Sequence, residues 1–224
     1  KKGFVDLRKF ITLYSKVLFM ENKNYQEDLL HIRKMMEKSS RVISLSGISG
    51  VFAGLFALAG AFYVYFLFKK NNIDYFDGTR NFYEVNLILH LVLVAMVVMF
   101  LAIVSGAYFT IRKSKKNNLP IWDNATKKLL INFAFPLAIG GVFCEALLYH
   151  HLHGLLAPVT LIFYGFALFN AGNYTFSDVK YLGLCEIILG IVSLFFIGYG
   201  LFFWAIGFGV LHIVYGIVMH KKYK

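Results

Sequence analysis

The stretch VISLSGISGVFAGLFALAGAFYVYFLF, residues 42–68, contains no Asp, Glu, Lys, Arg or His. Its 27 residues exceed the roughly 20 apolar residues that an α-helix needs to cross the hydrocarbon core of a bilayer. This stretch therefore predicts a transmembrane helix, and the rest of the chain can be interpreted outward from it.

The composition of the whole chain points to the same environment. Of its 224 residues, 58% are hydrophobic and only 16% are charged, whereas a soluble domain carries about 25% charged residues. The mean hydropathy is +0.64. Such a chain has too little polar surface for a water-soluble globule, which excludes a disordered protein, a secreted disulfide scaffold and an ordinary cytosolic enzyme.

Further apolar stretches along the chain also have the length of membrane-spanning helices. They are Val85–Ile111, Leu129–Tyr149, Leu152–Ala171, Tyr181–Ile197 and Leu201–Met219. We therefore expect an all-α, polytopic membrane protein with a bundle of six transmembrane helices over residues 42–219.

The placement of Lys and Arg predicts the orientation of this bundle. If both termini lie on one side, that side carries 20 of the 23 Lys and Arg residues. The positive-inside rule then places residues 1–41 and the tail 220–224 in the cytoplasm. We interpret the net charge of +11 as this topology signal and as a contact surface for the anionic headgroups of the bilayer. Residues 1–41 also hold five acids and no DNA-reading motif, so no nucleic acid is expected as a partner.

Residues 1–41 show the spacing of amphipathic helices. Apolar residues recur at steps of three and four with charged residues between them, at Phe4, Leu7, Ile11, Tyr14 and Leu18, and again at Leu29, Ile32 and Met36. Two interpretations are open for this segment. It lies on the inner membrane surface or under the bundle, or it forms a docking platform for a cytoplasmic or membrane protein partner.

Small residues in the first span predict how the helices pack. Gly50 and Gly54 stand four residues apart. This spacing lets the backbone of a second helix approach closely, which is how helices associate in lipid.

Ionisable residues inside spans are costly, so each is a candidate functional residue. They fall into two layers. The outer polar cluster comprises His90, Glu145, His150, His151 and His153, and the inner polar pair comprises Glu186 and His212.

Three interpretations are open for the outer cluster. Its side chains are of the types that bind zinc, copper or iron, they suit a proton sensor that couples histidine to Glu145, and they are equally the hydrogen-bonded histidines of a membrane interface. Residues five apart on a helix, as Glu145 and His150 are, do not face one ion, and the HExxH zinc motif is absent. We predict no cofactor, although a metal or haem stays an alternative. For Glu186 and His212 we expect a buried hydrogen bond that joins two helices.

Two strings, EKSSRVISLSGISG at residues 37–50 and GLFFWAIGFGVLHIVYG at residues 200–216, resemble a family of uncharacterised bacterial membrane proteins. This resemblance implies a bacterial inner-membrane location and no catalytic activity. The last two spans are also similar in composition to small six-helix acid-resistance membrane proteins.

These observations favour a non-enzymatic membrane protein, a sensor or an accessory subunit that acts with a partner through its cytoplasmic N-terminal helices. One alternative is a binder or transporter of lipids or small molecules with a polar cavity near Glu145 and His90. The other alternative is a membrane redox protein that carries metal or haem.

Overall fold

The computed structural model divides the chain into two compact units, Lys1–Val42 and Ile43–Lys224. It describes residues 28–30, 32, 47–71, 73, 84–117 and 120–223. In the first unit, residues 28–30 and 32 are helical and exposed. The predicted amphipathic helices of residues 1–41 otherwise lie outside the described residues and stay a prediction.

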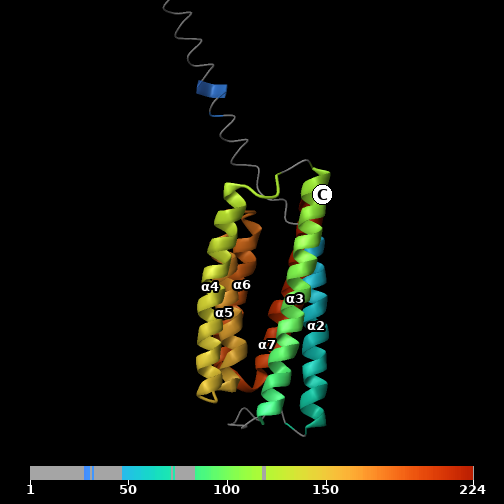
Figure 1. Ribbon diagram of the computed structural model, residues 1–224, viewed down its shortest axis with the longest axis vertical. Helices are drawn as coiled ribbons and strands as arrows, with labels where there is room; N and C mark the ends of the chain where they lie inside the picture. Colours follow the sequence, from blue (N-terminus) through green and yellow to red (C-terminus); the bar gives the residue numbers. More distant parts are fainter. Residues whose placement is uncertain are drawn as a thin grey trace, which may run out of the picture. The chain divides into compact units, whose positions relative to one another are not determined.

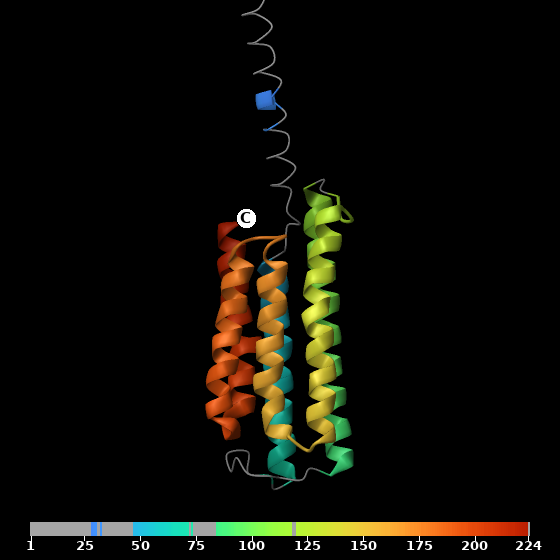
Figure 2. The ribbon, with the colours of Figure 1, turned by 90° about the vertical axis from the view of Figure 1, so that its left-hand side faces the viewer.

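Every regular element described in the second unit is helical. The elements are α2 (Gly47–Lys70), α3 (Val85–Lys116), α4 (Asn124–Tyr149), η2 (His153–Leu155), α5 (Leu156–Ala171), α6 (Asp178–Phe195), η3 (Ile197–Tyr199), α7 (Gly200–Trp204), η4 (Ala205–Leu211) and α8 (His212–Lys222). Residues 197–222, from η3 to α8, follow one another without a break and are called the C-terminal segment below. Successive long helices run in alternating directions (Figures 1 and 2).

Five helical segments are long and apolar enough to cross a membrane. They are Gly47–Lys70, Val85–Lys116, Asn124–Tyr149, His153–Ala171 and Ile197–Lys222. The helix that does not meet this description is α6, whose 18 residues include Asp178, Lys180 and Glu186. The structure therefore confirms an all-α, multi-pass membrane protein, with five candidate spans.

The helices of the second unit form two groups. α5 packs closely on both α4 and α6, whereas α2 packs on α3 and on the C-terminal segment. The contacts between the two groups are less extensive and run mainly from α5 and α6 to the C-terminal segment. Figure 1 shows α4, α5 and α6 on one side, α2 and α3 on the other, and α7 between them.

Glycines allow the closest helix contacts within each group. A Cβ atom on Gly54 of α2 would lie 2.6 Å from the carbonyl oxygen of Gly209, and one on Gly50 would lie 3.2 Å from the Cα atom of Gly216. Gly165 of α5 and Gly183 of α6 face each other in the same way. A Cβ atom on either one would lie 2.6 Å from the carbonyl oxygen of the other. Because lipid supplies no hydrophobic drive between helices, this close backbone packing holds the groups together.

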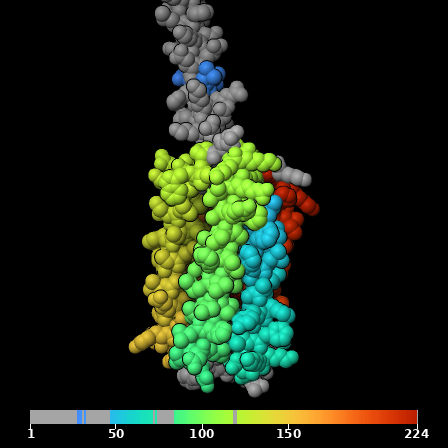
Figure 3. Space-filling model, turned by 45° about the vertical axis from the view of Figure 1, so that its right-hand side comes forward, coloured from blue at the N-terminus to red at the C-terminus, as the bar shows by residue number. Residues whose placement is uncertain are grey.

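α3 covers one side of α2 and exposes most of its own surface. Phe52 of α2 and Phe109 of α3 stack with their ring centroids 5.1 Å apart, and Ser114 is the buried residue of α3. The outward-facing apolar side chains of α3 include Leu89, Leu93, Met96, Phe100 and Ile103. Figure 3 shows this helix in the foreground between α2 and α4. Such an apolar exterior suits a helix surrounded by lipid.

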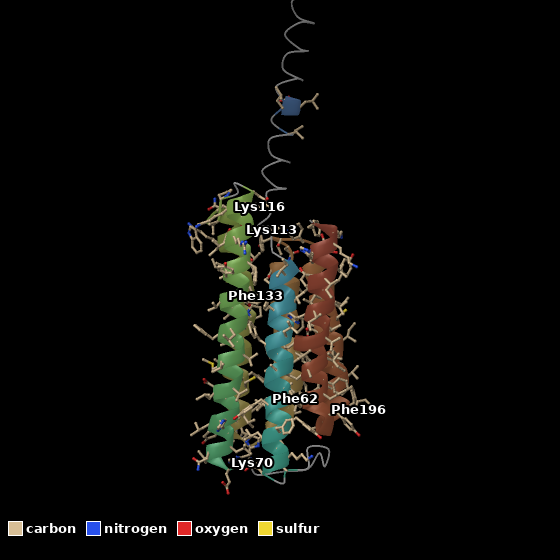
Figure 4. All side chains as sticks on the ribbon, turned by 90° about the vertical axis from the view of Figure 1, so that its right-hand side faces the viewer. Phe62, Lys70, Lys113, Lys116, Phe133 and Phe196 are labelled. Atoms are coloured by element: carbon tan, nitrogen blue, oxygen red, sulfur yellow. The ribbon has the colours of Figure 1, made fainter. Side chains whose placement is uncertain are left out.

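The alternating directions gather basic residues at one end of the bundle, where α3 and α8 end and α4 and α6 begin. The basic residues described there are Arg112, Lys113, Lys115, Lys116, Lys127, Lys128, Lys180, Lys221 and Lys222, against Lys69 and Lys70 at the opposite end. Figure 4 shows Lys113 and Lys116 at one end and Lys70 at the other. We call the first of these the basic end.

Hydrogen bonds fix the end of α8 at the basic end. The Nζ atom of Lys222 lies 2.9 Å from Oδ1 of Asp178, and the hydroxyl of Tyr223 donates to the same carboxylate at 2.8 Å. The Nζ atom of Lys113 donates to the Tyr223 carbonyl at 3.1 Å. These bonds connect α8 to the start of α6 and to the end of α3.

Candidate functional site

The inner polar pair is brought together at the junction of the two helix groups. Glu186 of α6 is 0% exposed and His212 of the C-terminal segment is 6% exposed. The Nδ1 atom of His212 lies 3.4 Å from Oε1 of Glu186 and 3.0 Å from the carbonyl oxygen of Gly207. Its Nε2 atom lies 2.7 Å from the hydroxyl of Tyr164 on α5. We call Tyr164, His212 and Glu186 the inner triad.

The hydrogen-bond partners of His212 fix where its proton lies when the ring is neutral. The Gly207 carbonyl can only accept, so Nδ1 must carry the hydrogen and donate it. The Nε2 atom of the neutral ring is then an acceptor, and the hydroxyl of Tyr164 donates to it. Both ring nitrogens are therefore engaged in hydrogen bonds, while Oε1 of Glu186 lies 3.4 Å from Nδ1 without accepting its hydrogen.

A π-helical turn shapes the C-terminal segment next to the triad. Residues Ala205–Leu211 form this turn directly before His212. A Cβ atom on Gly207 would collide with Oε2 of Glu186 and with Cδ2 of Leu161, so the carboxyl group rests against the bare backbone there. π-Turns interrupt helices at an energetic cost and are frequent at functional sites.

In the part of the chain that the structure describes, the Glu186 carboxyl group has no hydrogen-bond donor to stabilise its charge. Neither oxygen has a hydrogen-bond partner among the described residues, and a lone buried carboxylate is very costly. Two arrangements avoid that cost. Glu186 carries a proton as a neutral acid, or it stands as a carboxylate beside a protonated His212.

Aromatic rings line the other side of the triad. Phe208 lies with its ring centroid 6.1 Å from that of His212 and 4.8 Å from that of Tyr164. Phe133 of α4 meets Tyr164 edge to face at 6.0 Å, and Trp204 packs on Phe208 at 4.9 Å. In Figure 4, Phe133 lies in the half of the bundle nearer Lys113 and Lys116 than Lys70. The triad thus sits in an apolar setting, displaced toward the basic end.

The residues predicted as an outer polar cluster belong to several elements of the structure. His90 of α3 contacts α2, where its Nε2 atom lies 3.1 Å from the hydroxyl of Tyr63. Glu145 is exposed on α4. In the described ranges no group of three or more His, Cys, Asp or Glu side chains is arranged to hold a metal ion. α3 packs on α2 and has no extensive contact with α4. Residues at equal depth on α3 and α4 therefore need not be neighbours.

Among the histidines of the turn after α4, His151 has a structural role. The N–H of Leu152 donates to the carbonyl of Leu147 at 2.8 Å, and that of His151 donates to the carbonyl of Leu148 at 3.1 Å. This pair of bonds is the Schellman motif that closes a helix C-terminus, and it needs a left-handed residue at its centre. His151 takes that position with a φ of 58°. Exposed His150 is the C-cap residue, and half-buried His153 begins η2.

Sequence reasoning missed Tyr164, Gly207 and the π-turn. A tyrosine in an apolar helix and a glycine among other glycines carry no signal of their own. Tyr164 and Glu186 lie at similar distances from the basic end. This shared depth was the one feature of the sequence that could have suggested that Tyr164 belongs to the same site.

Comparison with known protein families, curated proteins and solved structures finds no match for this chain. The resemblance of residues 37–50 and 200–216 to a bacterial family therefore stays a prediction. The fold and composition define the class: a multi-pass membrane protein with five candidate spans.

Proposed function

We propose that this chain is a non-enzymatic membrane protein that senses protons through its inner triad. The observation that carries the proposal is a carboxyl group that is 0% exposed, lacks a hydrogen-bond donor among the described residues, and lies 3.4 Å from an imidazole nitrogen. Such an arrangement binds a proton at a defined place inside the membrane.

The groups that would exchange this proton are few. Tyr164 faces the site from α5, and His212 faces it from the C-terminal segment. A proton on Glu186 gives a neutral acid beside a neutral ring. A proton on Nε2 of His212 makes that atom a donor, so the Tyr164 hydroxyl must turn from donor to acceptor. The hydrogen bond between α5 and the C-terminal segment therefore depends on where the proton resides.

The position of the triad couples this change to the fold. Glu186 and Tyr164 belong to the group of α4, α5 and α6, whereas His212 belongs to the group that contains α2. Close glycine contacts join helices within each group, and the contacts between the groups are less extensive. A change of charge at this junction would therefore shift the two groups against each other.

We also propose the topology within which the sensor works. α6 is the sixth crossing, both termini face the cytoplasm, and the membrane is the inner membrane of a bacterium. The basic end described above supports this orientation by the positive-inside rule.

Infrared difference spectroscopy across a pH change tests the sensor directly. The purified protein should show the stretching band of a protonated carboxyl group that appears or disappears with pH. The band should be missing in Glu186→Gln, which keeps the shape of the side chain. Glu145→Gln is the matched control, because Glu145 is a second glutamate on the exposed surface of α4, and this variant should retain the band.

A second variant separates proton exchange from simple packing. Tyr164→Phe removes the hydroxyl that donates to His212 and leaves the ring, so the Glu186 band should persist with a shifted pH midpoint. A Glu186→Gln spectrum that matches the parent's would overturn the proposal, provided that circular dichroism shows the variant to be folded.

A further inference from the structure

The most strongly charged surface described in the second unit lies where α3 ends and α4 begins. Five exposed basic side chains gather on these two helix ends: Arg112, Lys115, Lys116, Lys127 and Lys128. None of them forms an ion pair with the described part of the chain. We call these five residues the basic patch.

Within the described residues, the patch has no ion-pair partner on the two helices that carry it. The acid between the two helix ends is Asp123, and it caps α4. Its Oδ1 atom accepts from the backbone N–H of Thr126 and from the Thr126 hydroxyl, each at 2.7 Å. This carboxylate is held by the start of the helix, and it forms no ion pair with the five basic side chains.

The patch projects beyond the neighbouring helices. α3 continues past its last apolar residue, Ile111, through Lys116, and α4 starts at Asn124, before its apolar part. Figure 2 shows the joined ends of α3 and α4 reaching beyond the corresponding ends of α5 and α6. At about 1.5 Å per residue, each basic extension spans the depth of a headgroup layer rather than the hydrocarbon core.

Apolar and aromatic side chains accompany the charges. Trp122 is 66% exposed and Ile121 is 37% exposed, both between the two helix ends. Exposed tryptophan concentrates at the level of lipid headgroups, where the ring meets the acyl region and its N–H stays in polar surroundings. A surface for nucleic acid or an acidic protein has no need of an exposed Trp at this depth, beside lipid-facing helices.

We propose that the basic patch is a binding site for anionic phospholipids. The phosphodiester groups would contact the lysines and Arg112, and Trp122 would lie at headgroup level. The proposed cytoplasmic position of the basic end decides which leaflet of the membrane would supply these lipids in the cell, and the inference rests on it in that respect alone. The site itself can be tested in a bilayer of uniform composition, whatever the orientation in the cell.

Tryptophan fluorescence gives the test, because the chain holds two Trp residues. In Trp204→Phe, the emission comes from Trp122 alone. This full-length variant is placed in mixed bilayers of phosphatidylglycerol and phosphatidylcholine, with one or the other lipid brominated as a quencher. Brominated phosphatidylglycerol should quench Trp122 more strongly at the same mole fraction. Electrostatic screening should reduce the difference at high salt.

Charge variants show whether the patch causes the preference. Changing all five residues to Gln should abolish the difference between the two quenchers, since each cation near an anionic surface contributes on the order of fivefold to binding. Lys69→Gln with Lys70→Gln, at the opposite end, is the matched control and should keep the difference.

Two results would overturn the proposal. One is equal quenching by the two lipids in the Trp204→Phe protein. The other is loss of the difference when inorganic phosphate replaces chloride at constant ionic strength, since this would assign the patch to free phosphate. Neither result bears on the Glu186 band, so the failure of this inference is distinguishable from failure of the proposed sensor.

Discussion

His151 occupies a position where the backbone favours glycine. Its φ of 58° lies in the left-handed region, which costs a residue with a side chain roughly 1–2 kcal/mol. Two backbone hydrogen bonds hold it there, from His151 to Leu148 and from Leu152 to Leu147. The strain is thus a local consequence of how α4 ends.

We therefore expect His151→Gly to stabilise the protein by about 1 kcal/mol. The measurement is the thermal unfolding temperature in detergent. His150→Gly is the control, because His150 has a φ of −88° and gains nothing from glycine. A lower unfolding temperature for His151→Gly would mean that its ring, 5.9 Å from the ring of His153, contributes more than the strain costs.

At the scale of single elements, α4 is started by Asp123. The hydrogen bond from the Thr126 backbone N–H lowers the pKa of the Asp123 carboxyl below its usual value. The folded state therefore binds this proton less readily than the unfolded state. Its stabilising effect is complete above the usual Asp pKa, and it is lost as the pH falls through the lowered one.

Asp123→Ala should accordingly destabilise the protein by about 1 kcal/mol at neutral pH, a typical value for an N-cap. The difference from the parent should shrink as the pH falls below about 4. Asp123→Asn keeps a capping oxygen and should show little loss at any pH. Unfolding curves measured over this pH range check both variants, and an unchanged difference in acid would contradict the explanation.

The contact between α2 and the C-terminal segment depends on the absence of a side chain at Gly54. A methyl group there would lie 2.6 Å from the Gly209 carbonyl oxygen and 2.6 Å from Cγ1 of Ile213. The Gly209 backbone cannot yield unless its whole helix moves. Gly54→Ala should therefore lower the free energy of unfolding by about 1–3 kcal/mol, as overpacking does at other buried sites.

Gly141 of α4 provides the matched control. A Cβ atom there meets nothing within 4 Å, so Gly141→Ala should instead stabilise the helix by roughly 0.5–1 kcal/mol. The two substitutions are chemically identical, and we expect opposite shifts in unfolding temperature. Equal shifts would show that close packing at Gly54 does not hold α2 in place.

At the scale of the whole molecule, hydropathy predicts depth but not lateral neighbours. The charge-free run 42–68 was enough to predict α2 as a membrane-length helix, and charges at the span ends predicted which helix ends share a side. The rotation of each helix about its axis is set by side-chain packing. The spacing of residues along the sequence does not reveal this rotation. For this reason the sequence did not predict Tyr164 beside His212, and the grouping of Glu145 with His90, which rests on depth alone, stays a prediction.

The remaining whole-molecule prediction concerns α6, on which the number of crossings depends. Its 18 residues span about 27 Å at 1.5 Å per residue, close to the roughly 30 Å of a hydrocarbon core. Asp178 and Lys180 lie in its first turn at the basic end, where Asp178 pairs with Lys222. Only Glu186 is then carried into the membrane, and it is shielded by His212 and Gly207.

If α6 crosses, the five candidate spans become six, and both ends of the chain lie on the same side. Reporter enzymes that are active only in the cytoplasm, fused before Lys1 and after Lys224, should therefore both be active, and one inserted at His150–His151 should be inactive. Activity at the N-terminus alone would mean that α6 does not cross. The basic end would then be divided between two compartments, and the bond between Asp178 and Lys222 could not form in the membrane.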